Sequence, residues 1–554
     1  MKNKIAYKAI VLFCIVAIAS CKKEEYLYDG TTTEGNITEA QVWANNDYAR
    51  GVLNNAYFFV AEGYNLDGDG AMLASGTDEA VNSNPNSSIN IFNNGTWSPL
   101  RTIDNVYANL YTGLRKVNLF IKNIDTANIV PVDGLTQYAD IRRLKGEAYF
   151  LRAFFHFELL KRFGAIPLAT RVFDRAEDLN LPKNTFDECQ NQIAKDCDSG
   201  IAMLPTWTQS WSTANRGRAT NQAALALKAR LLLYAASPLY NTANDLTKWQ
   251  LAANTAKAVI DSNKHSLITP YVNVFNYSTA PYNNEVIFAT EAVNRNDLET
   301  NNAPLSYDGG KGRTNPTQDL VDAFEMTNGK PITDATSGYN PQDPYKSRDP
   351  RFALNIIYNG LLWKGKIVQS YVGGADGLNK DVNATRTGYY LRKFLSESAT
   401  WNQAANTSVR RPWVVFRYAE VLLNYAEALN EAQGPVADVY KYVNLVRARA
   451  GIAMPALPVG LSQAQMRTRI QNERRIELCF EGHRFYDIRR WKLGEQLLNK
   501  AIGGMQITVN PTTGTFNYQT INVETRVFSS KNYLYPFSQN DINLQPALIQ
   551  NPGY

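Results

Sequence analysis

Residues 141–163 read IRRLKGEAYFLRAFFHFELLKRF, and this stretch decides the fold class. Its apolar residues recur three or four positions apart, at Ile141, Leu144, Ala148, Leu151, Phe155 and Leu159. This spacing places them along one face of an α-helix, and Gly164 with Pro167 ends the pattern. The sequence therefore predicts a long amphipathic helix that packs against other elements.

Further helices follow on the C-terminal side. Thr220 can cap NQAALALKARLLLYAAS, and Ser462 starts a capping box ahead of another helix. Residues 416–433 end at Gly434-Pro435, and a second helical stretch, ADVYKYVNLVRARA, follows. Two helices joined by a short Gly/Pro turn form an antiparallel pair, although no strict period of about 34 residues is present. We therefore predict a mainly α fold of helix pairs with large insertions.

Long irregular stretches separate these helices. Residues 62–104, 276–318 and 364–413 are rich in Asn, Gly, Ser and Asp, and such stretches are usually functional loops or disorder. Aromatic residues lie in them or at their borders: Trp97, Tyr282, Tyr307, Trp363 and Trp401. Aromatic rings on polar loops are typical of a binding face, because sugar rings stack on them. The alternative is that each Trp anchors its loop to the helical body.

The first residues, MKNKIAYKAIVLFCIVAIASC, carry a targeting signal. Three Lys precede an apolar segment, Ala9–Ala19, which is too short to span a membrane and is typical of a signal peptide. Ala19-Ser20 before Cys21 resembles a bacterial lipobox, so we predict a signal peptide over residues 1–20 and a lipid anchor, including palmitate, on Cys21. The alternative is an ordinary signal peptide with Cys21 incidental.

The charge balance is only mildly basic. Of 554 residues, 57 are Lys or Arg and 51 are Asp or Glu, which gives a net charge of +6. Loss of residues 1–20 removes three Lys and lowers this to +3. A nucleic-acid partner needs a clustered basic face, so we expect none. The 44% share of apolar residues excludes a wholly disordered chain.

Known catalytic, cofactor and metal motifs are absent from the sequence. It has no Walker A, GxGxxG, GxSxG or HExxH pattern, so we predict neither an enzyme nor a cofactor. Cys189 and Cys197 stand eight residues apart in a predicted helix, too far for a disulfide within it, and the three His lack zinc spacing. YNLDGDG (residues 64–70) lacks the bidentate Glu of a calcium loop, so a plain Asp-Gly turn is favoured and bound Ca²⁺ is unsupported.

The segment EGHRFYDIRRWKLGE (residues 481–495) is dense in charge. One interpretation is a basic ligand site built from His483 and its neighbouring Arg residues. The favoured interpretation is the start of a helix whose Arg and Asp side chains pair with neighbouring helices, with Trp491 packed beneath.

Several of these blocks together resemble the RagB/SusD family of outer-membrane nutrient-binding lipoproteins. The blocks are KGEAYFLRAFFHFELLKRFGAIPL (145–168), GRATNQAALALKARLLLYAASPLYN (217–241), DPYKSRDPRFALNIIYNG (343–360), VVFRYAEVLLNYAEALNEAQG (414–434), IQNERRIELCFEGHRFYDIRRWKLGE (470–495) and LYPFSQNDINLQPALIQNPGY (534–554). They run in order over nearly the whole mature chain. The resemblance implies four tetratricopeptide-like helix pairs as a scaffold, long irregular loop insertions and a few short strands.

The resemblance also implies a function. Family members are lipid-anchored at the cell surface, cap a SusC-like TonB-dependent transporter and deliver oligosaccharides to it without catalysis. Residues 21–275 would form an N-terminal region of scaffold and ligand-face loops, and residues 276–554 a C-terminal region of loops and helix pairs. The family's layout places the glycan site near Trp97, Asp78, Asn94, Tyr282, Arg295 and Tyr307, and the loop aromatic Trp363 is a further candidate.

Three alternatives remain open. One is a surface receptor for peptides or another nutrient. The second is a periplasmic helical-repeat scaffold that binds a partner protein and no small ligand. The third is a glycosidase, because paired carboxylates have no sequence signature.

Overall fold

A computed structural model describes residues 37–554 apart from 67, 175–176, 178, 207–211, 213–214, 277–279 and 402–405. The predicted signal peptide and Cys21 lie outside these described residues. None of the helices that are described is long and apolar enough to cross a membrane.

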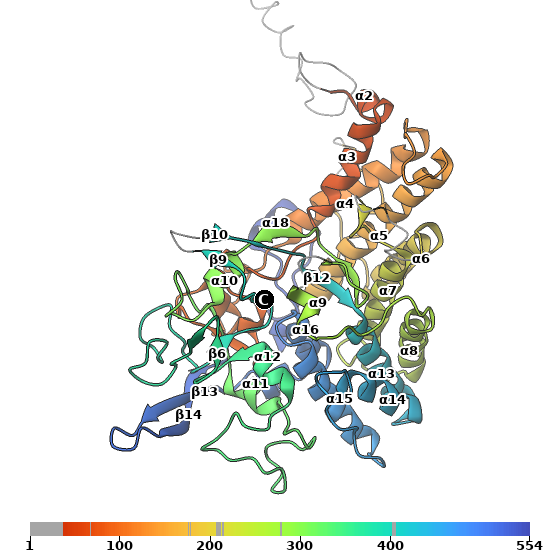
Figure 1. Ribbon diagram of the computed structural model, residues 1–554. Helices are drawn as coiled ribbons and strands as arrows, with labels where there is room; N and C mark the ends of the chain where they lie inside the picture. The colour runs from red at the N-terminus through yellow and green to blue at the C-terminus, as the bar shows by residue number, and fades with distance from the viewer. Residues whose placement is uncertain are drawn as a thin grey trace, which may run out of the picture.

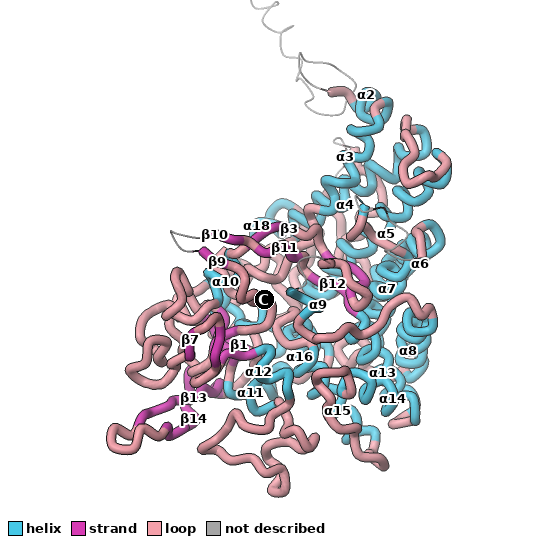
Figure 2. The backbone as a smooth tube through the Cα atoms, viewed as in Figure 1, coloured by secondary structure: helices cyan, strands magenta, loops and turns pink. Residues whose placement is uncertain are grey.

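The prediction of a mainly α fold is confirmed. Helices packed side by side form one curved half of the molecule, and a layer of loops and short strands forms the other half (Figures 1 and 2). The helices of the array are α2 (Glu39–Ala44), α3 (Asn46–Tyr57), α4 (Tyr107–Asn123), α5 (Gln137–Phe163), α6 (Phe186–Met203), α7 (Asn221–Ala236), α8 (Leu246–Asp261), α13 (Tyr418–Gln433), α14 (Ala437–Arg447) and α15 (Gln463–Glu477). The division into four tetratricopeptide-like pairs stays a prediction.

Helix α5 is the predicted helix of residues 141–163, extended by one turn at its N-terminus. The Thr136 side chain accepts a hydrogen bond from the Ala139 N–H, and Gly164 ends the helix with a φ of 70°. Since α4 and α6 both pack against α5, more than the predicted apolar face is buried. Polar residues are buried as well, and Arg152 reaches α6, where its Nη2 lies 2.6 Å from Asp196 Oδ1.

The other helix predictions also agree with the structure. The Thr220 side chain caps α7, and Ser462 forms the capping box with Gln465 at the start of α15. Along the array α7 packs against α8, α8 against α13, and α13 against both α14 and α15. Residues 262–417 are therefore an insertion between two helices that touch each other.

The loop layer holds short helices and paired strands. Its remaining helices are α9 (Asn273–Asn276), α10 (Asp297–Asn302), α11 (Gln318–Ala323), α12 (Pro350–Asn355), α16 (His483–Arg490), α17 (Gly494–Leu497) and α18 (Gln539–Leu544). Strands of the described chain pair antiparallel in twos: β1 (Ala80–Asn82) with β4 (Thr314–Pro316), β2 (Val286–Ala289) with β12 (Val414–Arg417), β3 (Val293–Arg295) with β11 (Val409–Arg411), β5 (Ile356–Ile357) with β8 (Tyr390–Leu391), β6 (Leu362–Trp363) with β7 (Lys366–Ile367), β9 (Thr400–Trp401) with β10 (Asn406–Thr407), and β13 (Ala501–Val509) with β14 (Phe516–Thr525). The β13–β14 hairpin projects from the molecule (Figure 2).

Two large apolar cores support the two halves. The core of the helical array includes Leu53, Leu151, Leu231 and Leu423, and so draws on residues from both predicted regions, 21–275 and 276–554. The loop layer has a second core of its own, mainly from residues 271–507. The boundary at 275/276 remains a prediction about the sequence.

A buried ion cluster lies where the helical array meets the loop layer. We call it the Arg417 cluster, and it comprises Arg417, Arg449, Glu285, Glu477 and Glu481. Arg417 Nη1 lies 2.9 Å from both Glu285 Oε1 and Glu477 Oε1, and its Nε lies 2.6 Å from Glu481 Oε2. Arg449 Nη2 lies 2.9 Å from the same Glu285 and Glu477 oxygens. The cluster ties β2, β12, α14 and α15 together with little access to solvent.

Candidate functional site

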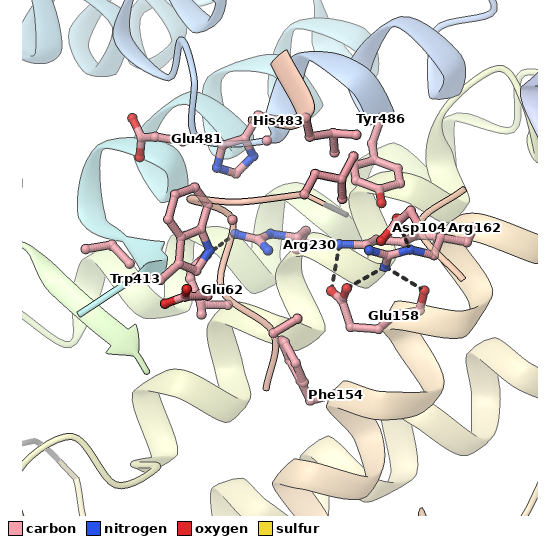
Figure 3. A pocket seen from close by; sticks show the side chains of 18 of the residues that line it. Glu62, Asp104, Phe154, Glu158, Arg162, Arg230, Trp413, Glu481, His483 and Tyr486 are labelled. Carbon is pink, nitrogen blue, oxygen red and sulfur yellow. Dashed lines mark hydrogen bonds and ion pairs between the residues drawn. The ribbon is translucent and has the colours of Figure 1, made fainter. Parts of the chain in front are cut away.

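A cavity of about 120 Å³ opens between the helical array and the loop layer (Figure 3). Segments far apart in sequence form its walls: the loop after α3, helices α5 and α7, the start of β12, and the turn into α16. The side chains used below are Glu62, Glu158, Lys161, Arg230, Trp413 and His483. Charged, aromatic and aliphatic groups therefore meet in one pocket.

Trp413 provides the aromatic wall of the pocket. Its backbone is fixed to the end of β2, because its N–H donates to Thr290 Oγ1 at 2.8 Å and its carbonyl accepts from the Thr290 N–H at 2.9 Å. The half-buried indole packs edge-on to Tyr64, with ring centroids 4.9 Å apart. It also lies directly over the backbone at Gly63, where a Cβ would overlap the indole. Glycine at position 63 is therefore required for this placement of Trp413.

The α5 wall of the pocket is an ion-pair group. Glu158 Oε1 lies 2.6 Å from Lys161 Nζ, and Glu158 Oε2 lies 2.6 Å from Arg162 Nη1. Burial alone would raise the pKa of the Glu158 carboxyl, but Lys161 and Arg162 lower it to about 2. Burial lowers the pKa of the Lys161 ammonium to about 8, although Glu158 opposes the change. At neutral pH Glu158 is therefore ionised and Lys161 is mainly charged.

Arg230 and His483 face the same space from α7 and α16 (Figure 3). Arg230 donates from Nε and Nη2 to Glu420 at 2.7 and 2.6 Å, and from Nη2 to the Val415 carbonyl at 2.6 Å. Burial, with Arg230 and three further cations nearby, holds the pKa of the His483 imidazole well below its usual range. His483 is therefore a neutral donor and acceptor at the pocket wall.

One of the predicted site residues contacts a side chain that lines the pocket. Arg295 forms ion pairs with Glu62 and with Asp297, the latter at 2.6 Å, and its guanidinium lies 5.0 Å from the centre of the Tyr64 ring. Tyr282 is connected to the pocket through Thr290, which bonds to the Trp413 backbone. The Tyr282 hydroxyl donates to the Thr290 carbonyl at 3.1 Å. The structure thus connects Arg295 and Tyr282 to the pocket, although neither lines it.

Trp97 cannot serve as the predicted stacking platform. Its exposed fraction is 1%, and its ring packs edge-on against Phe92 and Tyr535 at 4.8 and 4.7 Å between centroids. A sugar has no access to a ring covered in this way. The alternative interpretation, an aromatic anchor for its loop, is the one that the structure supports.

We therefore expect Trp97→Ala to act on stability and not on ligand binding. Loss of a large buried ring should lower the free energy of unfolding by about 3–5 kcal/mol. Urea denaturation measures this, and titration of any bound glycan with the folded variant should give an affinity within about twofold of the original. A tenfold loss of affinity would show that Trp97 belongs to the ligand site.

Asp78 is also wrong as a glycan ligand. It is 1% exposed, and its Oδ2 lies 2.8 Å from Arg484 Nη2 and 2.9 Å from Arg475 Nη2. Burial alone would raise the pKa of this carboxyl, but the two guanidinium groups hold it far below its usual range. Asp78 therefore stabilises the packing of α15 and α16 against the loop layer.

The neighbouring Glu79 makes stability depend on pH. Burial raises its pKa to about 8 from an ordinary value of 4.5, although Arg484 and the Phe480 N–H, which donates to the carboxyl at 3.2 Å, oppose the change. The folded state thus keeps a proton that the unfolded state releases between about pH 4.5 and 8. The free energy of unfolding should fall as pH rises through this window, by up to ~1.4 kcal/mol per pH unit. Urea unfolding of the original chain and Glu79→Gln at pH 5, 6.5 and 8 tests this, and parallel profiles would contradict it.

The remaining predicted residues lie away from the pocket. Tyr307 and Trp363 are 4% and 1% exposed and pack on each other in the second core, with the Tyr307 hydroxyl donating to the Trp363 carbonyl at 2.6 Å. Stacking on either ring is excluded by this burial. Asn94 is exposed, beside Val527, and its side chain accepts from the Thr96 hydroxyl at 2.6 Å.

The prediction for the segment 481–495 is confirmed in its structural interpretation, with one exception. Arg484 pairs with Asp78, Arg490 with Glu427 and Asp487, and the Trp491 indole N–H donates to Glu427 at 2.7 Å. The exception is His483, which lines the pocket together with Glu481, Gly482 and Tyr486. Trp413 was not among the predicted residues, although its place directly before the VVFR strand could have indicated a fixed aromatic side chain.

The candidate calcium loop, residues 64–70, contains a turn at its Asp-Gly end. Asp69 Oδ1 accepts from the Ala71 N–H at 2.9 Å, and its other oxygen accepts from Asn82 at 3.0 Å. Across the part of the chain that the structure describes, no group of three or more His, Cys, Asp or Glu residues is arranged to hold a metal ion.

The protein is a curved helical array with a loop layer and a mixed aromatic and charged pocket between them, and comparisons identify its family. One family model, described as the SusD family, matches residues 284–554, and another, described as starch-binding associating with outer membrane, matches residues 37–233. The chain therefore belongs to the SusD family.

Individual relatives agree. SusD-like protein P25 of Formosa agariphila is 25% identical over 479 residues, which cover 82% of this chain and 80% of that protein. The crystal structure of a SusD-like protein from Bacteroides fragilis is 27% identical with a TM-score of 0.78, covering 93% of this chain and 99% of that one. A SusD-like carbohydrate-binding protein from the same species is 25% identical with a TM-score of 0.77, covering 92% and 100%.

Proposed function

We propose that this protein is a non-catalytic, cell-surface lipoprotein that captures oligosaccharides in the Trp413 pocket and delivers them to a SusC-like TonB-dependent transporter. The observation that carries the proposal is the pocket itself, where a half-buried indole faces a set of charged hydrogen-bonding groups in a member of the SusD family. Pockets that bind small ligands have this composition, an apolar wall with a few convergent polar groups.

The chemistry of the pocket suits a sugar. The C–H face of a pyranose packs on the Trp413 indole, while Glu62, Lys161, Arg230 and His483 exchange hydrogen bonds with its hydroxyl groups. Stacking contributes about 1 kcal/mol beyond the buried area, and each net hydrogen bond contributes about as much, because water competes for it. The expected dissociation constants are micromolar to millimolar, which corresponds to a binding free energy of about 4 to 8 kcal/mol. This range suits a protein that must release its ligand.

The relatives support binding and location. The match to the carbohydrate-binding relative from B. fragilis covers that whole chain and most of this one. One matching family model is described as associating with the outer membrane. The signal peptide over residues 1–20 and the acylation of Cys21 complete the proposal, since they would place the protein on the membrane surface by a lipid anchor.

Isothermal titration of residues 22–554 against a panel of neutral and acidic oligosaccharides tests the proposed function. We expect saturable binding of at least one glycan, without release of new reducing ends. Binding of peptides instead would favour the alternative nutrient receptor, and release of reducing ends would favour a glycosidase. Failure of every glycan to bind would contradict the proposal.

The location is tested separately. Mass spectrometry of the mature N-terminus should find a lipid-modified Cys21, and protease added to intact cells should degrade the protein. A protein that survives this treatment with an unmodified N-terminus would be a periplasmic scaffold.

A further inference from the structure

The carboxylates that line the pocket are already bound by cations. Glu158 holds Lys161 and Arg162, and Asp104 accepts from Arg162 at 2.8 Å and from the Tyr535 hydroxyl at 3.0 Å. Glu481 binds Arg417 and Lys393, and Glu62 binds Arg295 at the rim. Few acceptors therefore remain free to receive hydroxyl groups from a ligand.

Several hydrogen-bond donors of the pocket, in contrast, lack an acceptor among the described residues. Arg230 is only 7% exposed and bonds through Nε and Nη2, whereas its Nη1 makes no hydrogen bond to any described residue. Lys161 Nζ has three N–H groups and a single hydrogen-bonding partner among the described side chains, Glu158. The His483 ring, which also lines the cavity, has no hydrogen-bonding partner among the described residues.

The backbone adds further hydrogen-bond donors to the pocket. Helix α16 has eight residues and starts at His483, and Gly482 at its N-cap supplies no side chain to bind the first amide groups. Gly482 and His483 both line the pocket, so the positive end of the helix dipole lies at its wall. The pKa of the His483 imidazole, lowered first by burial and then by Arg230 and other neighbouring cations, agrees with a positive potential at this end of the helix.

We propose that the pocket selects an acidic sugar, a pyranose that carries a carboxylate or a sulfate ester. The anionic group binds Arg230, Lys161 and the start of α16, and the ring packs on Trp413. This inference rests on the proposed function and names the class of glycan. Charge-assisted hydrogen bonds to a buried guanidinium are among the stronger contacts available to a ligand, so the acidic group would determine the choice of glycan.

Matched pairs of ligands that differ only in charge test the proposal. Suitable probes are tri-galacturonate, an oligomannuronate and a hyaluronan tetrasaccharide, each with its carboxyl methyl ester, and a carrageenan tetrasaccharide with its desulfated form. We expect at least one acidic form to bind tenfold or more tightly than its neutral partner in isothermal titration. Preference in a uronate pair or in the sulfate pair identifies the anionic group.

Two variants assign the preference to this pocket. Lys161→Met should reduce the preference for the acidic form about tenfold, and His483→Gln provides a second test if the first variant does not fold. Lys228→Met is the matched control, because Lys228 on α7 forms a comparable pair with Asp198, at 2.7 Å, on the surface away from the pocket. This control should leave the preference unchanged.

The outcomes separate the two proposals. If neutral and acidic forms bind equally, or if the folded Lys161→Met and His483→Gln variants keep the full preference, selection of acidic sugars is wrong while glycan binding stands. If no saccharide of either kind binds, the proposed function fails as well.

Discussion

Glu477→Gln should lower the free energy of unfolding by about 3–5 kcal/mol, the largest effect that we expect from a single isosteric change. Glu477 accepts from Arg417 Nη1 and Arg449 Nη2 at 2.9 Å each and from Arg351 Nη1 at 3.0 Å, and its side chain is 1% exposed. Burial alone would raise the pKa of this carboxyl, but the three guanidinium groups hold it far below its usual range. Removing its charge leaves three buried cations with too little compensation.

Urea denaturation of the original chain and the variant measures the effect. Asp198→Asn is the control, because it breaks the surface pair with Lys228 in which Asp198 is 57% exposed, and such pairs contribute at most about 1 kcal/mol. If Glu477→Gln costs no more than Asp198→Asn, the Arg417 cluster does not hold the array and the loop layer together.

Trp413→Ala should weaken glycan binding about tenfold to a hundredfold, the largest expected effect on binding. The estimate combines the buried area of an indole face with the additional stacking term, about 1.5 to 3 kcal/mol together. Isothermal titration with the tightest ligand of the panel measures it, and circular dichroism confirms that the variant is folded.

Gly63→Val tests the same ring without removing it. A Cβ at position 63 overlaps the indole, so the variant should displace Trp413 and lose affinity to a similar extent. If both variants fold and bind as tightly as the original chain, the glycan binds elsewhere.

The helices could be predicted from the sequence because their signals are local. Spacing of apolar residues, the Thr220 cap and the Ser462 capping box each act within about one turn, and all three agree with α5, α7 and α15. The burial of α5 on several sides was not predictable in this way, because it depends on α4 and α6 from other parts of the chain.

The candidate site could not be predicted because it depends on contacts between distant segments. Trp413, Lys161 and His483 meet in one cavity although they are separated by dozens to hundreds of residues. The polar composition of the loops was misleading, since the loop layer has its own apolar core that buries Tyr307 and Trp363. A polar loop sequence therefore does not indicate that its aromatic residues are exposed.

The pairing of charged side chains was predictable only in part. Arg484 and Arg490 are paired, as the segment 481–495 predicted, and Arg417 is buried and paired as well. Pairing partners such as Asp78 and Glu427 lie far away in the sequence, and only the folded structure identifies them.

A crystal structure of the protein with its tightest glycan tests the central claim most directly. We expect one sugar ring stacked on the Trp413 indole, with its polar groups bound to Arg230, Lys161 or His483 and the chain leaving past Arg295. A glycan bound on another surface, with the pocket unoccupied, would contradict it.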